Sequence, residues 1–365
     1  TLPNVSLIHP RPSIRHRTFP VTQAIPTQPG FADDDPDRLT PGVRIIQGDR
    51  SHALRIARRL VGQHLPNIDQ AARNLVASAQ SHNIDFSLAF ASVLGTDDSA
   101  PIRQVALGVL GAGRTAMTFF SEPAPGGDPD GPDAARAERS ACLRALCDHV
   151  HRSRAREAVI AQALPEPGHD WAVTPLIRSG FLSVGTLLYL RRQPGTLPEI
   201  RLPAGSGVHA RAVADLPGRD RDRILIAALD ASYEGTLDCP ELCGLRSTRD
   251  ILESHKATGS FDPTSWWVYV VDHQPLGCLL LSKSAEHGTI ELVYMGLGVA
   301  LRGRGLGKPL LVEGLRRICG RYPGFGVACA VDERNTPARR VYESLGFKAF
   351  ARRQAWVRPL ATPTT

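Results

Sequence analysis

The sequence predicts a mixed α/β fold built as two tandem domains. In the C-terminal half, apolar strand-like segments alternate with segments of helical spacing in the order β-α-α-β-β-β-α-β-α-β. The N-terminal half repeats this order more faintly. Its Ser179, Gly180 and Phe181 correspond to the Leu-Gly-Phe sequence that ends at Phe347, and an apolar strand follows each of them. We therefore infer an internal duplication.

The chain has 365 residues, which is enough for two domains of ordinary size. Residues 1–42 are rich in Pro, Thr and Arg and lack periodicity, so we expect them to be disordered. The Pro- and Gly-rich stretch 193–207 is typical of an interdomain linker. These two segments place the domains at residues 43–192 and 208–360.

Apolar runs and helical spacing define the elements of the first domain in chain order. Its expected strands are 43–47, 86–93, 104–111, 115–120, 157–163 and 181–190. Its expected helices are 53–61, 69–78, 134–151 and 172–179.

The second domain has a clearer pattern. Its expected strands are 208–214, 266–272, 276–282, 289–297, 326–331 and a final strand or hairpin at 347–358. Its expected helices are 220–231, 248–255, 307–321 and 337–345. Leu310, Leu311, Leu315 and Ile318 have helical spacing, and Asn335 or Thr336 is a suitable cap for the last helix.

Composition excludes several classes of protein. The net charge of +7 comes from Arg, since the chain has only four Lys, and no basic block with interleaved aromatic residues indicates nucleic-acid binding. No apolar run is long enough to span a membrane, and the first residues do not resemble a signal peptide. Seven Cys without a C-x-x-C pair are typical of a reducing compartment, so we expect a cytoplasmic protein with neither nucleic-acid nor membrane partners. We expect no metal, because Cys239 and Cys243 lack a second ligand pair nearby.

A glycine turn between Arg302 and Lys308 is the most informative motif. It follows an apolar strand and opens a helix, which is an arrangement that presents backbone N–H groups to a phosphate. A Walker A loop would need Gly at position 302 and Ser or Thr at position 309, where the chain has Arg302 and Pro309, so a nucleotide-phosphate enzyme is disfavoured. The spacing also fails the dinucleotide pattern G-x-G-x-x-G, but it fits Arg-x-x-Gly-x-Gly.

This motif resembles the acetyl-CoA-binding motif of the GNAT N-acetyltransferase superfamily. A second match follows about 30 residues later, where Asn335 opens the last helix, Tyr342 lies two turns on, and Gly346 precedes the next strand. The resemblance implies two tandem GNAT-like domains, each a mostly antiparallel central sheet flanked by helices. The motif does not recur at residues 112–117, and Leu176 or Ile177 stands where Tyr342 should recur, so the first domain resembles a degenerate copy without a CoA site.

The resemblance also implies a set of cofactor-binding residues for acetyl-CoA, which is the cosubstrate. They are Met295, Gly296 and Leu297 for the thioester arm, Gly303, Arg304, Gly305, Leu306, Gly307 and Lys308 for the pyrophosphate, and Arg302 and Asn335. The two Arg side chains are equally compatible with a solvated role, and Asn335 with a capping role alone.

Tyr342 is the expected general acid, and a Tyr packed with its hydroxyl on a backbone carbonyl is the alternative. Glu291 is the first candidate for the base, acting through water, although an ion pair with a neighbouring Arg is an alternative role. Glu234 and Asp238 are the runners-up, and they lie in a polar loop expected to cover the acceptor site. We expect His255 and His287 at the surface.

The leading hypothesis is therefore an acetyl-CoA-dependent N-acetyltransferase. It would act on a primary amine of a small molecule or peptide by direct attack in a ternary complex. One alternative is a CoA-binding sensor without turnover. Another follows from the tandem architecture, which also resembles that of mycothiol-synthase-like proteins, although no motif here is specific to that acceptor.

Overall fold

The computed structural model describes residues 38–79, 81–97 and 99–360. Most of the segment expected to be disordered, residues 1–37, lies outside the described residues. The described residues form one sheet of twelve strands in the order β1-β2-β3-β4-β5-β12-β6-β11-β10-β9-β8-β7. Strands β4 and β10 pair in parallel with β5 and β11, and every other neighbouring pair is antiparallel. The expected mixed α/β fold with a mostly antiparallel sheet is confirmed.

The N-terminal half contributes the first six strands. They are β1 (Val43–Gln47), β2 (Ala89–Leu94), β3 (Ile102–Gly111), β4 (Thr115–Phe120), β5 (Ile160–Ala163) and β6 (Leu182–Arg192). Its helices are α1 (Ala53–Leu60), α2 (Ile68–Ala77), α3 (Gly131–Ser153) and α4 (Asp170–Arg178). The expected strand 86–93 begins later than predicted, because Asp85 caps a single 3-10 turn at Phe86–Leu88.

The C-terminal half contributes the other six strands. They are β7 (His209–Ala212), β8 (Trp266–Val271), β9 (Gln274–Ser284), β10 (Thr289–Leu297), β11 (Gly326–Asp332) and β12 (Lys348–Pro359). Its helices are α5 (Arg221–Tyr233), α6 (Thr248–Lys256), α7 (Gly307–Arg321) and α8 (Thr336–Ser344). The last segment is one long strand and not a hairpin. Residues 193–208, which include the expected linker, contain no helix or strand.

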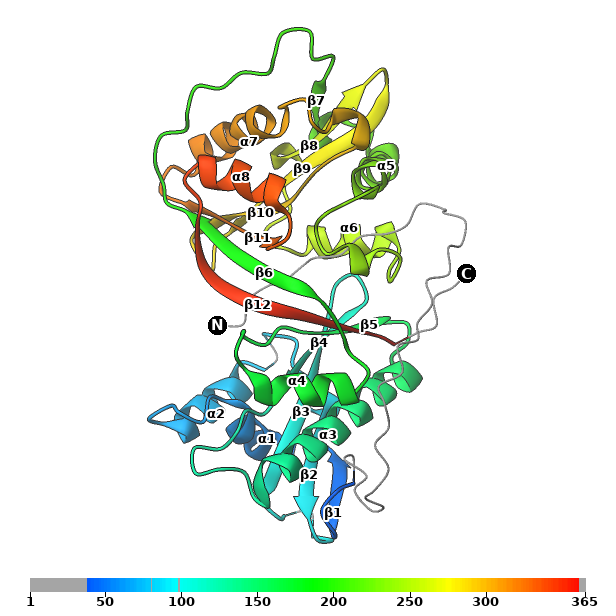
Figure 1. Cartoon of the computed structure of the whole chain (residues 1–365), viewed down its shortest axis with the longest axis vertical. Coiled ribbons are helices and arrows are strands. Elements are labelled where there is room, and N and C mark those ends of the chain that lie inside the picture. Colours follow the sequence, from blue (N-terminus) through cyan, green and yellow to red (C-terminus); the bar gives the residue numbers. More distant parts are fainter. Residues whose placement is uncertain (1–37, 80, 98, 361–365) are drawn as a thin grey trace, which may run out of the picture.

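Helices cover both faces of the sheet in each half (Figure 1). In the C-terminal half, α7 and α8 pack on one face through Leu310, Leu315 and Tyr342, and α5 and α6 pack on the other through Leu229 and Ile251. In the N-terminal half, α3 and α4 share one apolar core and α1 and α2 share another. Each face is therefore stabilised by burial of the apolar side of a helix pair.

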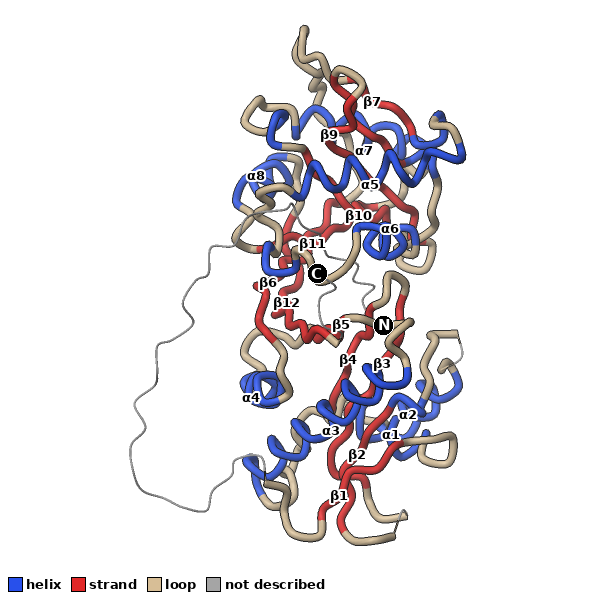
Figure 2. Tube along the Cα trace, turned by 90° about the vertical axis from the view of Figure 1, so that its right-hand side faces the viewer, coloured by secondary structure: helices blue, strands red, loops and turns tan. Residues whose placement is uncertain are grey.

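The last strands of the two halves are exchanged. β6 ends the N-terminal half in sequence, yet its residues from Leu187 to Arg192 pair with β11 of the C-terminal half. β12 ends the C-terminal half, yet it pairs with β5 of the N-terminal half, and β6 and β12 also pair with each other. Figure 1 shows β6 and β12 crossing the middle of the molecule side by side, and Figure 2 shows the strands continuing through both halves. We propose that residues 43–192 and 208–360 are two domains that share this central strand pair.

A second contact joins the halves at the turn between β3 and β4. Arg246 donates to the carbonyl of Gly113 and to the hydroxyl of Thr115, and Ser254 of α6 donates to the carbonyl of Ala112. Gly113 has φ +71°, and a Cβ there would lie 1.9 Å from the Ser254 hydroxyl. This turn therefore requires Gly for both its conformation and its close approach to α6.

The strand exchange predicts that cutting the chain between the halves does not separate them. We would insert a protease site at Ala204, an exposed position in the segment without secondary structure. After cleavage the two fragments should elute together in size-exclusion chromatography, because β6 pairs with β11 and β12 pairs with β5. They should separate only in denaturant. Elution as two folded fragments in native buffer would contradict the exchanged arrangement.

Candidate active site between strands β10 and β11

The site begins where two parallel strands part. β10 and β11 pair only at their first three residues, from the partners Thr289 and Gly326 to Glu291 and Ala328. On its other side β10 stays paired with β9 as far as Leu297, with an irregularity in register between Leu292 and Tyr294. A cavity of about 670 Å³ opens between the parted strands. Beyond Glu291, the side of β10 that faces β11 has no strand partner, so its backbone is available to a ligand.

Most of the expected cofactor-binding residues line this cavity. They are Met295, Gly296, Leu297, Arg302, Gly303, Gly305, Leu306, Gly307, Lys308 and Asn335. Arg304 is not among the lining residues. Tyr342 and Asp238 also line the cavity, whereas Glu291 and Glu234 do not.

The glycine turn leads directly into α7. Gly303 and Gly305 have φ +71° and +73°, and nothing lies within 4 Å of the position a Cβ would take at either residue. Their requirement for Gly is therefore conformational. Leu306 at the N-cap of α7 supplies no side-chain hydrogen bond, so no capping side chain occupies the N–H groups of the first turn. A free helix N-terminus at one end of a cavity suits the pyrophosphate of CoA.

The two arginines of the turn make structural contacts. Arg302 donates through Nε to the carbonyl of Leu297 at 2.8 Å, through Nη1 to Gly235 at 2.9 Å and through Nη2 to Ser232 at 2.7 Å. Arg302 thereby ties the end of α5 to the end of β10. Arg304 donates to the carbonyl of Ser206, in the segment between the halves.

Helix α8 brings Asn335 and Tyr342 to the cavity. The Asn335 side chain accepts from the N–H of Ala338 at 3.3 Å, so Asn335 caps α8 and also lines the cavity. The Tyr342 ring packs 5.6 Å from the ring of Phe347. Its hydroxyl makes no hydrogen bond to any residue that the structure describes. Burial, with smaller effects of Cys329 and Asp238, raises the pKa of Tyr342 well above its usual value. The phenol therefore stays protonated at neutral pH.

Asp238 is the carboxyl group that lines the cavity. Burial raises its pKa to about 6, with a smaller contribution from the charge of Asp332. Its Oδ1 accepts from the N–H of Asp332 at 2.8 Å. Asp332 in turn accepts from the N–H of Cys239 at 3.0 Å and from Arg334, which also holds Glu241 at 2.6 Å. This network fixes the loop between α5 and α6 against the end of β11.

Glu291 and Glu234 lie outside the cavity wall. Glu291 is half-buried, accepts from the Thr289 hydroxyl at 2.6 Å, and has its pKa raised by burial. The alternative of an Arg ion pair is not seen among the described residues. Glu234 is exposed one residue beyond the end of α5.

The expectation of a surface position is wrong for His255. Its ring is fully buried and stacks 5.5 Å from the ring of Tyr294, and burial lowers its pKa to about 3. The reason is that α6 packs onto the sheet, with Ile251 and Leu252 in the same apolar core as Tyr294. His287 is exposed, as expected.

The corresponding region of the N-terminal half is filled by side chains. Phe120 at the end of β4 meets Trp171 in the first turn of α4, with ring centroids 5.5 Å apart. Arg139 lies over the same Trp171 ring and pairs with the buried Asp128 at 2.7 Å. Of the two residues expected where Tyr342 should recur, Leu176 is buried in the core and Ile177 is exposed. An internal carboxylate and an indole therefore lie near the first turns of α3 and α4, in the region that corresponds to the cavity of the other half.

One acetyl-CoA is expected to bind per chain, measured by calorimetric titration. Gly305→Val should weaken binding by at least about tenfold, because Val is strained at φ +73° and its side chain would enter the space proposed for the phosphates. Gly205→Val is the matched control, since Gly205 has φ +72° and open space around it and lies outside the cavity. Two equivalent binding events per chain would contradict a filled N-terminal site.

The raised pKa of Asp238 predicts a pH-dependent stability difference for Asp238→Asn. The usual pKa is 3.8 and the folded value is about 6, so the wild type loses stability as pH rises through this window. The Asp238→Asn variant has no ionisable group at this position, so it does not lose stability in this way. Between pH 4 and pH 7.5 it should gain roughly 1–3 kcal/mol relative to wild type in urea unfolding. A stability difference that is the same at both pH values would contradict the raised pKa of the Asp238 carboxyl.

Within the described residues, no helix combines the length and the apolar character needed to cross a bilayer. No group of three or more His, Cys, Asp or Glu side chains suited to a metal ion occurs in the same residues.

Comparison with known proteins agrees with the geometry. Residues 233–347 match the Acetyltransferase (GNAT) family. A mycothiol acetyltransferase of Thermomonospora curvata is 31% identical over 276 residues, which cover 70% of this chain and 86% of the relative. One from Mycobacterium leprae is 26% identical over 281 residues, or 88% of its length.

Among solved structures, a GCN5-related N-acetyltransferase from Sphaerobacter thermophilus has the same fold. It aligns with a TM-score of 0.56 and 18% identity over 89% of this chain and 98% of its own. Fold, motif and relatives agree, and the chain belongs to the GNAT family of acetyltransferases.

Proposed function

We propose that this protein transfers the acetyl group of acetyl-CoA to a primary amine of a small molecule or peptide in a ternary complex. The observation that carries the proposal is the Tyr342 hydroxyl. It is protonated and free of hydrogen bonds to described residues, and it belongs to a cavity that residues 295–297 also line. A CoA-binding domain without turnover has no need of a buried acid at this position.

In the proposed reaction the pyrophosphate lies on the glycine turn and the N-terminus of α7. Those backbone N–H groups of residues 295–297 that face away from β9 stabilise the oxygen of the thioester carbonyl. The amine nitrogen attacks the carbonyl carbon and the carbon–sulfur bond breaks. Tyr342 gives its proton to the departing thiolate, and the proton lost by the amine passes through water to Glu291.

Glu291 suits the role of base for two reasons. Burial raises its pKa, which strengthens it as a proton acceptor, and among the described side chains only Thr289 bonds to it. Asp238 is engaged by the N–H of Asp332, so we assign it to the acceptor side of the cavity as a carboxyl that receives the ammonium group. We propose that Glu234, which is exposed, contacts the acceptor at the entrance of the cavity.

A second candidate acceptor comes from the relatives. Because a relative that is 31% identical over 86% of its length is a mycothiol acetyltransferase, the amine precursor of mycothiol belongs in any panel of acceptors. The tandem arrangement of the chain is compatible with this acceptor.

Tyr342→Phe and Glu291→Gln test the mechanism. Release of free CoA thiol would be followed with a panel of amines, peptides and the mycothiol precursor. Tyr342→Phe should lower kcat by about 100-fold, because the leaving thiolate loses its acid, and should leave acetyl-CoA affinity unchanged. Glu291→Gln should remove the acidic limb of the pH–rate profile, since the wild type loses activity as Glu291 becomes protonated.

Tyr322→Phe is the matched control, because Tyr322 follows α7 outside the cavity and should keep full activity. Wild-type turnover by Tyr342→Phe would contradict the assigned acid. Acetyl-CoA binding without acetylation of any acceptor would favour a sensor instead.

A further inference from the structure

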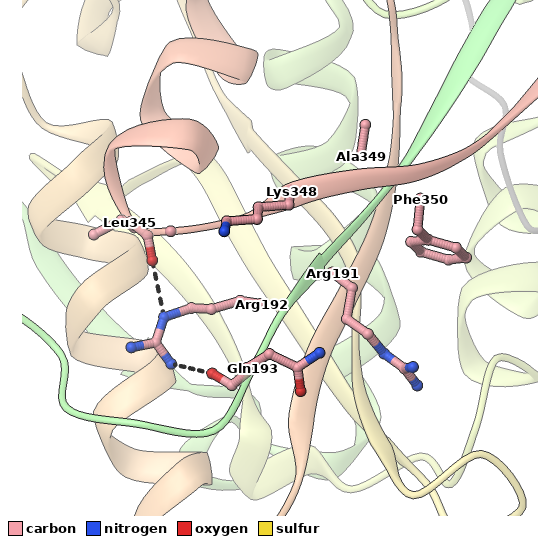
Figure 3. Close-up of a pocket in the computed structure, with 8 residues that line it drawn as sticks. Arg191, Arg192, Gln193, Leu345, Lys348, Ala349 and Phe350 are labelled. Carbon is pink, nitrogen blue, oxygen red and sulfur yellow. Dashed lines mark hydrogen bonds between the residues drawn. The ribbon is translucent and has the colours of Figure 1, made fainter.

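A second cavity of about 480 Å³ lies where β6 ends and β12 begins (Figure 3). Its lining residues include three cations, Arg191, Arg192 and Lys348, and no carboxylate. Gln193 and Phe350 also line this cavity. A cavity with this lining is complementary to an anion.

Arg192 forms part of the cavity wall and is held in place by backbone carbonyls. Its side chain is buried, and it donates through Nε to the carbonyl of Leu345 at 2.9 Å and through Nη2 to Thr196 at 2.7 Å. Figure 3 shows Arg191 extending to the opposite side of the strand. The cations available to a ligand are therefore Arg191 and Lys348, both of which are exposed.

Arg191 and Lys348 occupy directly facing positions on β6 and β12. Like charges at facing positions destabilise a sheet. Neither side chain forms a hydrogen bond or ion pair with any residue in the described part of the chain. The other arginines of β12 differ, since Arg352, Arg353 and Arg358 pair with Glu333, Glu166 and Asp148 at 3.1, 2.8 and 2.7 Å. Among the described cations of β12, Lys348 is thus the one without an acidic partner.

The second cavity is related to the active-site region through the register of the sheet. Glu291, Ala328 and Arg191 are register partners on β10, β11 and β6, so their side chains lie on one face. Two strand spacings separate Glu291 from Arg191, which is about 10 Å. The charge of Arg191 reaches Glu291, whose pKa it lowers slightly against the larger effect of burial.

Aromatic side chains lie along the same face. Tyr189 is the register partner of Ala330, which lines the active-site cavity, and its ring meets that of Phe350 at 6.2 Å. The Tyr189 hydroxyl is buried and has no partner among the described residues. Tyr189, Arg191 and Phe350 therefore extend the acceptor side of the active site toward the second cavity.

We infer that the acceptor carries an anionic group remote from its reacting amine, about 10 Å from the proposed base Glu291, and that Arg191 binds this group. The inference rests on the proposed function and names its substrate class, which is an amine with a distant carboxylate or phosphate. A tripeptide has this span, because three extended residues measure about 10 Å. Since β6 belongs to the N-terminal half, that half would supply acceptor recognition to the catalytic half.

The first experiment compares acceptors that differ only in the anion. Gly-Gly-Gly with a free carboxylate should be acetylated with a kcat/KM at least about tenfold above that of its C-terminal amide. A second pair of acceptors, 6-aminohexyl phosphate and hexylamine, differs only in a phosphate. Comparing the two pairs shows whether the site prefers a carboxylate or a phosphate. Arg191→Gln should abolish the preference by lowering only the reaction of the anionic acceptor. Arg50→Gln, an exposed arginine near α1, is the matched charge control and should keep the preference.

A preference that Arg191→Gln leaves unchanged would overturn the inference. So would equal use of acid and amide by the wild type, or efficient acetylation of the mycothiol precursor that is insensitive to Arg191→Gln.

A binding experiment separates this inference from the proposed reaction. Acetyl-Gly-Gly-Gly and its amide would be titrated into the CoA-bound protein, which requires no turnover. Binding of the acid alone, lost in Arg191→Gln, supports the anion site even where Tyr342→Phe has no effect on the reaction. Equal binding of acid and amide, or equal binding by wild type and variant, would overturn it.

Discussion

The structure depends on the parting of two parallel strands. β10 and β11 are partners for three residues and then diverge, which leaves one side of β10 without sheet hydrogen bonds. Buried backbone groups need partners, so such a gap is costly unless a ligand fills it. The gap is held open from both sides. β9 pairs with β10 throughout, and the end of β10 is fixed by Arg302 and by the N–H of Gly298 on the carbonyl of Leu276.

The other side of the gap depends on the exchanged strand. β11 is held by β6, which arrives from the N-terminal half, and β6 is held in turn by β12. The N-terminal half is therefore part of the scaffold of the cleft even though its own parting strands, β4 and β5, are closed by Phe120 and Trp171. We propose that the N-terminal half, without a cofactor site of its own, stabilises the candidate site of the C-terminal half through β6.

The local features of this protein were predictable from sequence. The bounds of β10 and α7 were predicted to the residue, because an apolar run, a glycine turn and helical spacing are local signals. The family resemblance that this turn carries also predicted Asn335 and Tyr342 as site residues, and both line the cavity. The strand exchange could not be predicted, because β6 and β12 have apolar patterns that fit either neighbour.

Burial of polar side chains was the other feature that sequence could not supply. The importance of Asp238 comes from the network of Asp332, Arg334 and Glu241, whose members come together only in the fold. His255 lies in a helix of polar composition, and its burial against Tyr294 has no local signal.

Hydrogen exchange of backbone amides, with and without acetyl-CoA, tests the central claim that the parted strand receives the cosubstrate. The account predicts slower exchange on binding at residues 295–297 and 303–308, and unchanged exchange at residues 115–120 of β4. Protection of residues 115–120, or no change at residues 295–297, would contradict it.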